Sequence, residues 1–187
     1  AAGELKERLE RMLGEQALDI WASTFHSSCV RILRRNAEYI GYSSNFTIYD
    51  TDDSRRLMKE CMKTLNMEER VIGHKQILSE ISRAKDSLVS ADEYLNLSSG
   101  NYREKQIGEC YKKYQSLLKS ADAMDFDDII FNTVKLLEEN PQIREYYQNK
   151  FKYVLVDEYQ DTNHAQFMLT KLLSSGYNNI CVVCDDD

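Results

Sequence analysis

Short apolar runs that stop at polar residues occur at three places in the chain, and each run predicts a buried β-strand. The three runs are Asp19–Ser23, Tyr153–Val156 and Ile180–Val183. Between the second and third runs, apolar residues recur at helical spacing over Ala165–Ser174, and Gly176 follows where such a helix would end. A strand, a helix and a strand in this order predict a βαβ unit whose strands are parallel.

The stretch from residue 50 to residue 150 has a different pattern, because most of its apolar residues recur every three or four positions. Helices are expected from a cap at Asp50, from a break at Gly73, over Tyr102–Ala121, from a cap at Asp125 to Glu138, and from Asn140-Pro141. The pattern therefore predicts an α/β protein in which a mostly α-helical subdomain, residues 50–140, interrupts a parallel sheet formed by residues 1–49 and 141–187.

Composition narrows the class of protein. Apolar residues make up 42% of the 187 residues and charged residues 29%, which is the balance of a globular domain with a core. The chain has 7 Gly and 1 Pro, so few positions interrupt helices and an all-β sandwich is disfavoured. No apolar run approaches the roughly 18 residues of a membrane span, and the first residues lack the order of a signal peptide. We therefore expect a cytoplasmic protein without a membrane segment.

The charge is distributed unevenly along the chain. Lys and Arg number 24 and Asp and Glu number 31, which gives a net charge of −7 and excludes a polybasic protein that binds polyanions non-specifically. Residues 1–119 hold 19 basic and 18 acidic residues, a net charge of +1, whereas residues 120–187 hold 5 and 13, a net charge of −8. The acidity therefore belongs to the last third of the chain.

The five cysteines are an odd number, which argues against a disulfide framework. Cys29, Cys61 and Cys110 lie at apolar positions and are expected in the core. Cys181 and Cys184 have the spacing of a redox or metal-binding pair, but residues three apart in a strand point to opposite faces and lie about 10 Å apart. We expect these two in the core as well, with thiol or metal chemistry as the alternative.

Polar residues follow each predicted strand, and in open parallel sheets ligands bind beyond the carboxyl ends of the strands. The three ends are Ser23–Ser27, Asp157–Asp161 and Asp185–Asp187, of which the last two are rich in carboxylates. An aspartate directly after a buried strand is well placed to hold Mg²⁺, and an adjacent glutamate could orient and deprotonate an attacking water. The alternative is that these acidic residues belong to solvated loops.

Three segments resemble motifs of the superfamily 1 DNA helicases of the UvrD, Rep and PcrA family. Val154–Gln166 resembles the acidic Walker B motif of that family. Thr24–Ser27, followed by Cys29–Leu33, resembles the threonine-phenylalanine-histidine motif that touches single-stranded DNA, and Met124–Asp128 resembles a segment that offers a base-stacking phenylalanine. The segments occur in the family's order and spacing, and the resemblance covers essentially the whole chain.

The resemblance implies a role for each residue of the acidic motif. Asp157 would bind Mg²⁺, Glu158 would be the general base toward the water that attacks the γ-phosphate of ATP, and Gln160 would sense the nucleotide state. The strands would then belong to a partial RecA-like sheet of the P-loop NTPase type.

The resemblance also implies which residues contact DNA. Thr24, Phe25 and His26 would touch the DNA backbone or a base, and Phe126 would stack on a base. Each ring has an alternative role, because His26 could cap the helix that follows it and Phe126 could pack beneath its own helix. The helix expected after His26 carries a basic stripe that consists of Arg31, Arg34 and Arg35. This stripe could meet phosphates or form a solvated face.

The sequence departs from the family pattern in two places. No stretch fits the phosphate loop, in which Gly, four residues, Gly, Lys and Ser or Thr follow one another. The resemblance places that loop before Ala1 and the second motor domain after Asp187, so the chain is expected to be cut at both ends and inactive toward ATP by itself. Cys184 stands where the family usually has glycine, which puts the roles of Asp185–Asp187 in doubt.

The implied activity is ATP-driven 3′-to-5′ translocation on single-stranded DNA and duplex unwinding, in repair or replication. The implied partners are single-stranded and junction DNA and the second motor domain, and the implied cofactors are ATP and Mg²⁺. Two alternatives remain open at this point. One is a single-stranded DNA-binding module without ATPase activity. The other is a stand-alone Mg²⁺-dependent phosphohydrolase built on Asp157, Glu158, Asp161 and Asp185.

Overall fold

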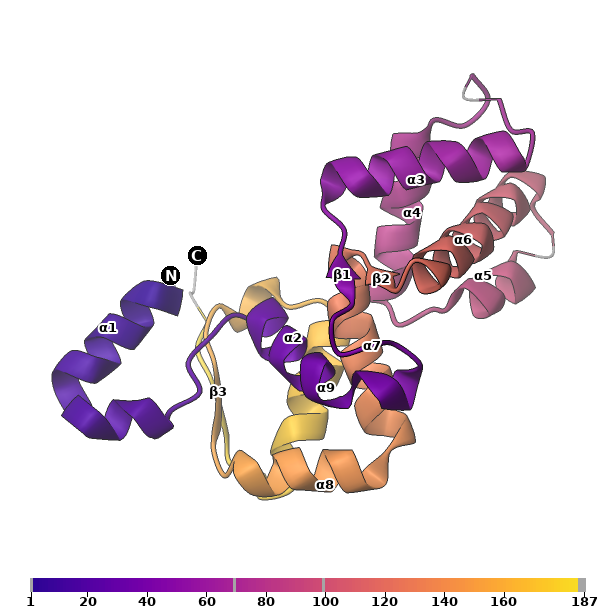
Figure 1. Cartoon of the computed structure of the whole chain (residues 1–187). Coiled ribbons are helices and arrows are strands. Elements are labelled where there is room, and N and C mark those ends of the chain that lie inside the picture. Colours follow the sequence, from indigo (N-terminus) through magenta and orange to yellow (C-terminus); the bar gives the residue numbers. More distant parts are fainter. Residues whose placement is uncertain (1, 69, 99, 185–187) are drawn as a thin grey trace.

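A computed structural model describes residues 2–68, 70–98 and 100–184 of the chain (Figure 1). Helices dominate these residues and group into two lobes, which Figure 1 shows at the lower centre and the upper right. The strands are short, and they pair in parallel. This is the mostly helical α/β architecture that the sequence predicts. No helix of the described residues is both long and apolar enough to cross a membrane.

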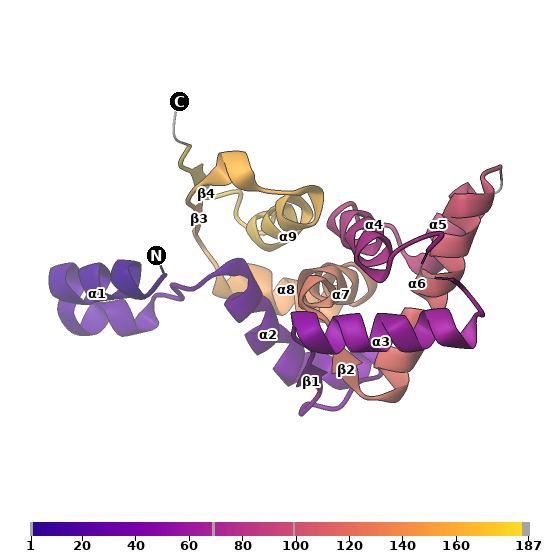
Figure 2. The same ribbon diagram turned by 90° about the horizontal axis from the view of Figure 1, so that it is seen from above.

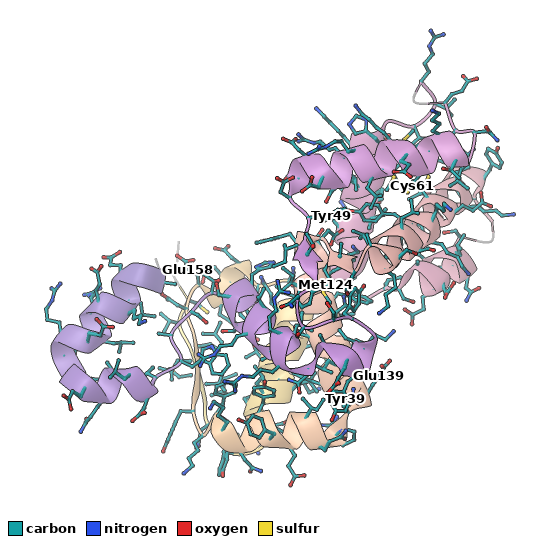
Figure 3. All side chains as sticks on the ribbon, viewed as in Figure 1. Tyr39, Tyr49, Cys61, Met124, Glu139 and Glu158 are labelled. Atoms are coloured by element: carbon teal, nitrogen blue, oxygen red, sulfur yellow. The ribbon has the colours of Figure 1, made fainter. Side chains whose placement is uncertain are left out.

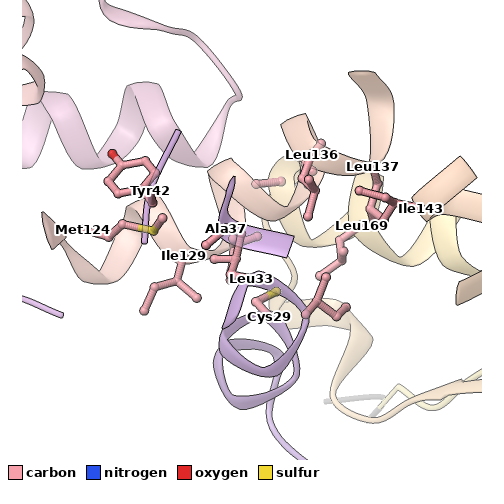
Figure 4. Packing of buried hydrophobic residues seen from close by; sticks show 14 of the residues in the cluster. Cys29, Leu33, Ala37, Tyr42, Met124, Ile129, Leu136, Leu137, Ile143 and Leu169 are labelled. Atoms are coloured by element: carbon pink, nitrogen blue, oxygen red, sulfur yellow. The ribbon is translucent and has the colours of Figure 1, made fainter. Parts of the chain in front are cut away.

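The first lobe consists of four helices that share one hydrophobic core. They are α2 (Phe25–Asn36), α7 (Phe126–Glu139), α8 (Pro141–Lys150) and α9 (His164–Ser174). Figure 4 shows side chains of this core, including the fully buried Cys29, Leu33, Ile129, Leu137 and Leu169. Burying one such aliphatic side chain contributes roughly 1.5–3 kcal/mol, so this core ties the beginning of the chain to its end.

The second lobe has a core of its own. Its helices are α3 (Thr51–Thr64), α4 (His74–Asp86), α5 (Ala91–Leu97) and α6 (Tyr102–Ser120). The core contains Met58, Cys61, Ile77, Ile81 and Tyr114, which are inaccessible to solvent or nearly so. The helix that begins at Phe126 packs in the first lobe, although it falls within the residues expected in the helical subdomain.

Helices begin where capping residues predict. Asp50 caps α3 and Asp125 caps α7, each with a capping box that satisfies two backbone N–H groups at the helix start. Gly73 precedes α4, and Asn140-Pro141 opens α8. The predicted helices are confirmed, to within one residue wherever the sequence predicts both ends.

The βαβ unit is confirmed. Strand β3 (Val154–Val156) pairs in parallel with β4 (Ile180–Val182), and α9 connects the two. A second parallel pair was not expected from the sequence: β1 (Thr47–Ile48) and β2 (Ala123–Met124) lie where the two lobes meet (Figure 1). Strands of two residues are too short to show an alternating pattern, so only the structure finds them.

The predicted burial of the β3 and β4 strands is wrong for most of their residues. Val156 is buried, but the side chain of Leu155 is 74% exposed and all of β4 is exposed. Among the described residues these two strands pair only with each other. A two-stranded ribbon leaves most of its apolar side chains open to solvent.

The strand predicted over Asp19–Ser23 is absent. A short 3₁₀ helix, η1 (Gly14–Asp19), ends there, and the residues that follow are extended but pair with no strand of the described chain. Trp21 packs instead against Phe151, with ring centres 5.0 Å apart, and beneath the guanidinium group of Arg31. The helix α1 (Ala2–Leu13) precedes this region and projects away from both lobes (Figure 2).

The cysteines divide into two groups. Cys29, Cys61 and Cys110 are buried and free, as predicted, and burial raises the pKa of each thiol, to about 12, 12 and 11 respectively. Cys181 and Cys184 are also free but exposed, so their predicted place in the core is wrong. The reason is the same open face that exposes the rest of β4.

Candidate functional site

The segment Thr24–Ser27 forms the start of α2. Thr24 is the N-cap residue, and its Oγ1 accepts a hydrogen bond of 3.2 Å from the backbone N–H of Ser27. A cap of this kind stabilises a helix end by about 1 kcal/mol. Phe25 is half-buried and packs against the core of the first lobe. The exposed residue Thr24 therefore faces solvent at the helix start, while Phe25 is largely committed to the fold.

His26 and Phe126 lie face to face. Their ring centres are 3.7 Å apart and their planes differ by 17°, which is a stacked arrangement. Phe126 is the first residue of α7 and His26 is the second residue of α2, so the starts of two helices far apart in the sequence meet here. The ring of Phe126 is 58% exposed. The structure thus brings together two side chains for which the sequence predicts a common ligand.

The other roles considered for these rings do not match their positions. Thr24 rather than His26 supplies the side-chain cap of α2. Phe126 is too exposed to act as an apolar anchor beneath α7. Stacked rings with an open face form a platform on which a further aromatic ring can stack.

The imidazole of His26 is disfavoured as a cation. Burial lowers its pKa from the ordinary value of 6.5, and the nearby Asp127 and a backbone hydrogen bond with Phe126 oppose that shift only in part. His26 is therefore an uncharged ring at neutral pH. A neutral imidazole favours stacking or hydrogen bonding to a base over an ion pair with a phosphate.

The basic stripe of α2 is partly engaged within the protein. Arg34 donates a 3.0 Å hydrogen bond to the carbonyl of Ser44 and lies over the ring of Phe46. Arg31 covers Trp21, with its guanidinium carbon 4.0 Å from the ring centre, but it remains exposed, as does Arg35. Two of the three arginines are therefore available to meet phosphates.

The two adjacent carboxylates of the acidic motif follow directly after β3. Asp157 and Glu158 are both exposed, and the backbone N–H of Glu158 donates a 3.1 Å hydrogen bond to Oδ1 of Asp157. Glu158 has a φ of 52°, a left-handed conformation that costs energy in a residue other than glycine. Gln160 is exposed and lies in the 3₁₀ turn η3 (Tyr159–Asp161) that follows. Figure 3 shows Glu158 by the strand pair, far from Cys61 in the second lobe.

The donor set at this strand end fits Mg²⁺ only as a partial site. The described residues contain no group of three or more His, Cys, Asp or Glu side chains that could hold a metal ion. Mg²⁺ is commonly bound through one or two carboxylates, with waters and substrate phosphates completing its octahedron. Asp157 fits that pattern as one carboxylate ligand beside Glu158. The third acidic strand end, Asp185–Asp187, lies outside the described residues.

A second acidic cluster is buried, and sequence reasoning missed its cationic partner. The Nζ atom of Lys85, in the last turn of α4, lies 2.6 Å from Oδ2 of Asp125 and 2.9 Å from Oδ1 of Asp128. The side chain of Lys85 is 1% exposed. A signal was present, because Lys85 stands four residues after Ile81 and eight after Ile77, on the apolar face of its helix.

The charges of this cluster stabilise one another. Burial would lower the pKa of Lys85, but Asp125 and Asp128 raise it well above its ordinary value. Burial would raise the pKa of Asp125, but the charge of Lys85 and the hydrogen bonds that Asp125 accepts hold that pKa below 3.8. Burial and then the charge of Asp125 raise the pKa of Asp128 to about 6. Two carboxylates thus share one ammonium group, and Asp128 keeps its proton more readily than Asp125.

The residue next to Lys85 contacts the acidic motif. Nδ2 of Asn163 donates a 2.7 Å hydrogen bond to Oδ1 of Asp86. Asn163 is the N-cap residue of α9 and the last residue before that helix. Sequence reasoning also missed Asp86, and no spacing in the chain pairs it with Asn163, because the two residues are far apart in the sequence.

Comparison with known protein families matches residues 1–187 to the UvrD/REP helicase N-terminal domain. The chain belongs to the UvrD/REP helicase family. The resemblance found in the three sequence motifs is therefore confirmed for the whole length of the chain.

Relatives within the UvrD/REP family are similar over the whole chain. The chain is 46% identical over 187 residues to the ATP-dependent DNA helicase PcrA of Bacillus subtilis (strain 168), and covers 25% of that protein. It is 44% identical over the same length to proteins of that name from Staphylococcus aureus (strain Mu50) and Staphylococcus epidermidis, and covers 26% of each. The chain thus spans about a quarter of the length of these relatives.

Proposed function

We propose that the chain is part of the first motor domain of an ATP-dependent DNA helicase, which couples ATP hydrolysis to 3′-to-5′ translocation on single-stranded DNA and to duplex unwinding. Membership of the UvrD/REP family supports this proposal, as do relatives that carry the name ATP-dependent DNA helicase. The β3–α9–β4 unit would belong to a RecA-like parallel sheet. Because the chain spans about a quarter of those relatives, the activity is proposed for the complete gene product.

The observation that carries the proposal is the stacked pair of His26 and Phe126, with its ring centres 3.7 Å apart. An exposed aromatic platform suits single-stranded DNA, because every base has a face that can stack and each such contact contributes about 1–3 kcal/mol. Thr24 lies at the start of α2, the helix that carries His26, and its side chain could meet the DNA backbone there. Phe25 would support the platform from the core side rather than touch a base.

The exposed carboxylates after β3 would act on the nucleotide. Asp157 would hold Mg²⁺, Glu158 would orient the attacking water and accept its proton, and Gln160 would sense the nucleotide state. When bound, the metal ion would neutralise part of the phosphate charge. The chain contains no phosphate loop, so the 187-residue chain by itself is expected not to hydrolyse ATP. A phosphate-release assay with DNA present tests this, since turnover above background would refute it.

The two lobes suggest how the parts of the motor domain are divided. The sequence assigns residues 1–49 and 141–187 to the motor domain and residues 50–140 to the helical insertion that would help hold junction DNA. Because α7 packs in the first lobe with α2 and α9, the insertion would instead end before α7, which would carry Phe126 on the motor side.

ATP hydrolysis by the complete gene product, with and without single-stranded DNA, tests the proposed function. A Glu158→Gln variant is expected to lose DNA-stimulated turnover by at least about a hundredfold, because a general base contributes roughly 10²–10⁴-fold. The matched control is Glu139→Gln, an exposed carboxylate of α7 that Figure 3 labels and that lies 3.8 Å from Lys135. Turnover that survives in Glu158→Gln, or that is lost equally in the control, would contradict the assignment.

A DNA-binding module without ATPase activity is the second candidate. It is favoured by the fact that the platform of His26 and Phe126 is built from the starts of α2 and α7 and uses no residue of the acidic motif. This candidate predicts DNA affinity that falls with salt concentration but does not respond to ATP. The same preparation distinguishes the two functions, because only the helicase shows turnover that DNA stimulates.

A further inference from the structure

The last turn of α4 reaches from the second lobe into the first. Most of α4 packs in the core of the second lobe through Ile77 and Ile81. At its end, Lys85 and Asp86 point to two different helices of the first lobe, and Leu88 packs against the first core. Leu88 has a φ of 58°, so the chain turns sharply there and leaves the helix end between the lobes.

Lys85 holds the helix that carries the aromatic platform. Its ammonium group binds Asp125, whose Oδ1 accepts a 2.8 Å hydrogen bond from the backbone N–H of Asp128 and so caps α7. Phe126 is the residue immediately after that cap. The position of the Phe126 ring is therefore set through a cap that α4 holds in place.

Asp86 holds the start of α9, which contains the last residues of the acidic motif. Asn163 uses both ends of its amide: Oδ1 accepts a 2.9 Å hydrogen bond from Gln166 N–H to cap α9, and Nδ2 donates to Asp86. The turn η3 leads from Glu158 to this cap, and the N–H of Asp161 donates a 3.1 Å hydrogen bond to the carbonyl of Glu158. Asp86 thus fixes one end of a short loop whose other end is Glu158.

The charge of one residue of α7 reaches both sides. Asp127, the second residue of α7, acts electrostatically on both His26 and Asp86. Burial raises the pKa of Asp86, and the charge of Asp127 raises it further. Asp86 takes part in none of the ion pairs found among the described residues. Its carboxylate accepts the hydrogen bond from the side-chain amide of Asn163. A shift of α7 would therefore change the environment of the carboxylate that anchors α9.

We propose that Asp86 is a positioning residue that couples the His26–Phe126 platform to the acidic motif, through its hydrogen bond to Asn163. The inference rests on the proposed function and adds to it the route by which DNA on the platform affects turnover at Glu158. Asp86 touches neither DNA nor nucleotide. The end of α4 holds α7 and α9 in one relative arrangement in which both sites are correctly placed: Lys85 makes the contact with α7, and Asp86 makes the contact with α9.

The test uses the complete gene product and measures the ratio of ATP turnover with and without single-stranded DNA. Asp86→Ala is expected to lower this ratio about tenfold, within the 5–150-fold range of typical site-to-site coupling. Turnover without DNA, and DNA affinity without nucleotide, should stay within about twofold. The matched control is Asp92→Ala, which removes an exposed carboxylate paired with Lys112 at 2.7 Å and should leave the ratio unchanged.

A pair of exchanges at the hydrogen bond separates coupling from a general loss of folding. Asn163→Asp keeps a side chain that caps helices well but cannot donate to Asp86, so it should lower the ratio as Asp86→Ala does. Combining Asn163→Asp with Asp86→Asn restores one donor and one acceptor in the reverse direction, and the ratio should recover to within about threefold of wild type. A misfolded protein would show no such recovery.

Two results would overturn the inference. In the first, DNA stimulates the ATP turnover of the wild-type protein, and the Asp86→Ala and Asn163→Asp variants are stimulated as much as wild type. The hydrogen bond then does not couple the sites, while the proposed function stands. If the double exchange fails to recover although its thermal unfolding matches that of wild type, the bond is not the element that matters. A wild-type protein without DNA stimulation would instead refute the proposed function itself, and the coupling with it.

Discussion

Two acidic clusters of similar composition occupy opposite environments in this protein. Asp125 and Asp128, at the start of α7, are buried and share the ammonium group of Lys85. Asp157 and Glu158, at the end of β3, are exposed to solvent. Each cluster begins directly after a short strand, with Asp125 after β2 and Asp157 after β3, and each leads into a helical turn.

The comparison shows that burial and pairing decide what a carboxylate can do. A buried carboxylate needs a partner, because moving an isolated charge out of water is costly. Asp125 and Asp128 already have theirs, so they hold two lobes together and have little capacity left for a ligand. Asp157 and Glu158 are hydrated, so a metal ion or an attacking water can approach them.

Removing the buried cation should destabilise the chain strongly. Lys85→Met keeps the apolar stem but leaves Asp125 and Asp128 without their ammonium partner, which is expected to lower the free energy of unfolding by about 3–5 kcal/mol. Urea denaturation of the 187-residue chain, followed by circular dichroism, measures the change.

The control for Lys85 is the exposed ion pair of Lys112 with Asp92, at 2.7 Å. Lys112→Met should cost at most about 1 kcal/mol, because solvent screens exposed pairs. Removing all three buried charges together, by adding Asp125→Asn and Asp128→Asn to Lys85→Met, should cost less than Lys85→Met alone. Equal effects at Lys85 and Lys112 would show that the two ion pairs are not distinguished by burial.

The buried cluster should also make stability depend on pH. The pKa of Asp128 is raised from 3.8 to about 6, so between these values the folded chain holds a proton that the unfolded chain has released. This contribution to stability is complete below about pH 4 and is lost as the pH rises through about 6. The lowered pKa of Asp125 acts in the opposite direction, and its effect falls at the acidic end of this range. Asp128→Asn should remove this dependence in urea titrations between pH 4 and 7, whereas Asp157→Asn should leave it intact.

Removing the exposed ring of the platform should affect binding rather than folding. Phe126→Ala is expected to weaken single-stranded DNA binding by the complete gene product about tenfold, which is near the lower end of the 1–3 kcal/mol range for one stacked base. The ring is 58% exposed, so its removal should change the stability of the chain by less than about 1 kcal/mol. Fluorescence anisotropy with a labelled oligonucleotide measures the affinity, and Tyr39→Ala, an exposed ring on η2 (Ala37–Ile40), is the matched control (Figure 3). Equal affinity of Phe126→Ala and wild type would remove Phe126 from the DNA contact.

Much of the helical structure follows from local chemistry and could therefore be predicted. Asp50 and Asp125 accept hydrogen bonds from backbone N–H groups at the starts of their helices, and Pro141 begins a helix at the position where its missing N–H costs nothing. The parallel pairing of β3 and β4 follows from the helix between them. The helix starts depend on residues within one turn of each other, and the strand pairing joins two strands that are consecutive in the chain.

The features that could not be predicted depend on residues far apart in the chain. The strand expected at Asp19–Ser23 has no neighbour to pair with in the described residues, so its apolar residues pack on side chains instead. The position of Lys85 on the apolar face of its helix signals burial, but only the packing of that helix against α7 shows which carboxylates pair with it. The link from Asp86 to Asn163 joins two polar residues with no pattern in common. The motifs of the candidate site were recognisable in the sequence, but the meeting of His26 with Phe126 was not.

The smallest expected effect concerns the backbone of the exposed cluster. Glu158 adopts a φ of 52°, where a side chain is strained and glycine is not. Glu158→Gly should therefore raise the free energy of unfolding of the 187-residue chain by about 0.5–1 kcal/mol, less the entropy that glycine adds to the unfolded chain. In the complete gene product the same change should abolish DNA-stimulated ATP turnover, because the proposed base is gone.

A gain in stability together with a loss of turnover is the signature of a residue kept for chemistry at the expense of the fold. Asn178 provides the control, because it also has a positive φ, 55°, but lies in the turn before β4 and carries no proposed role. Asn178→Gly should change stability in the same direction and leave turnover intact. If Glu158→Gly instead destabilised the chain, the strained backbone would have to be supported by contacts of its side chain. The exposed cluster would then share the structural role of the buried one, and the contrast between the two would fail.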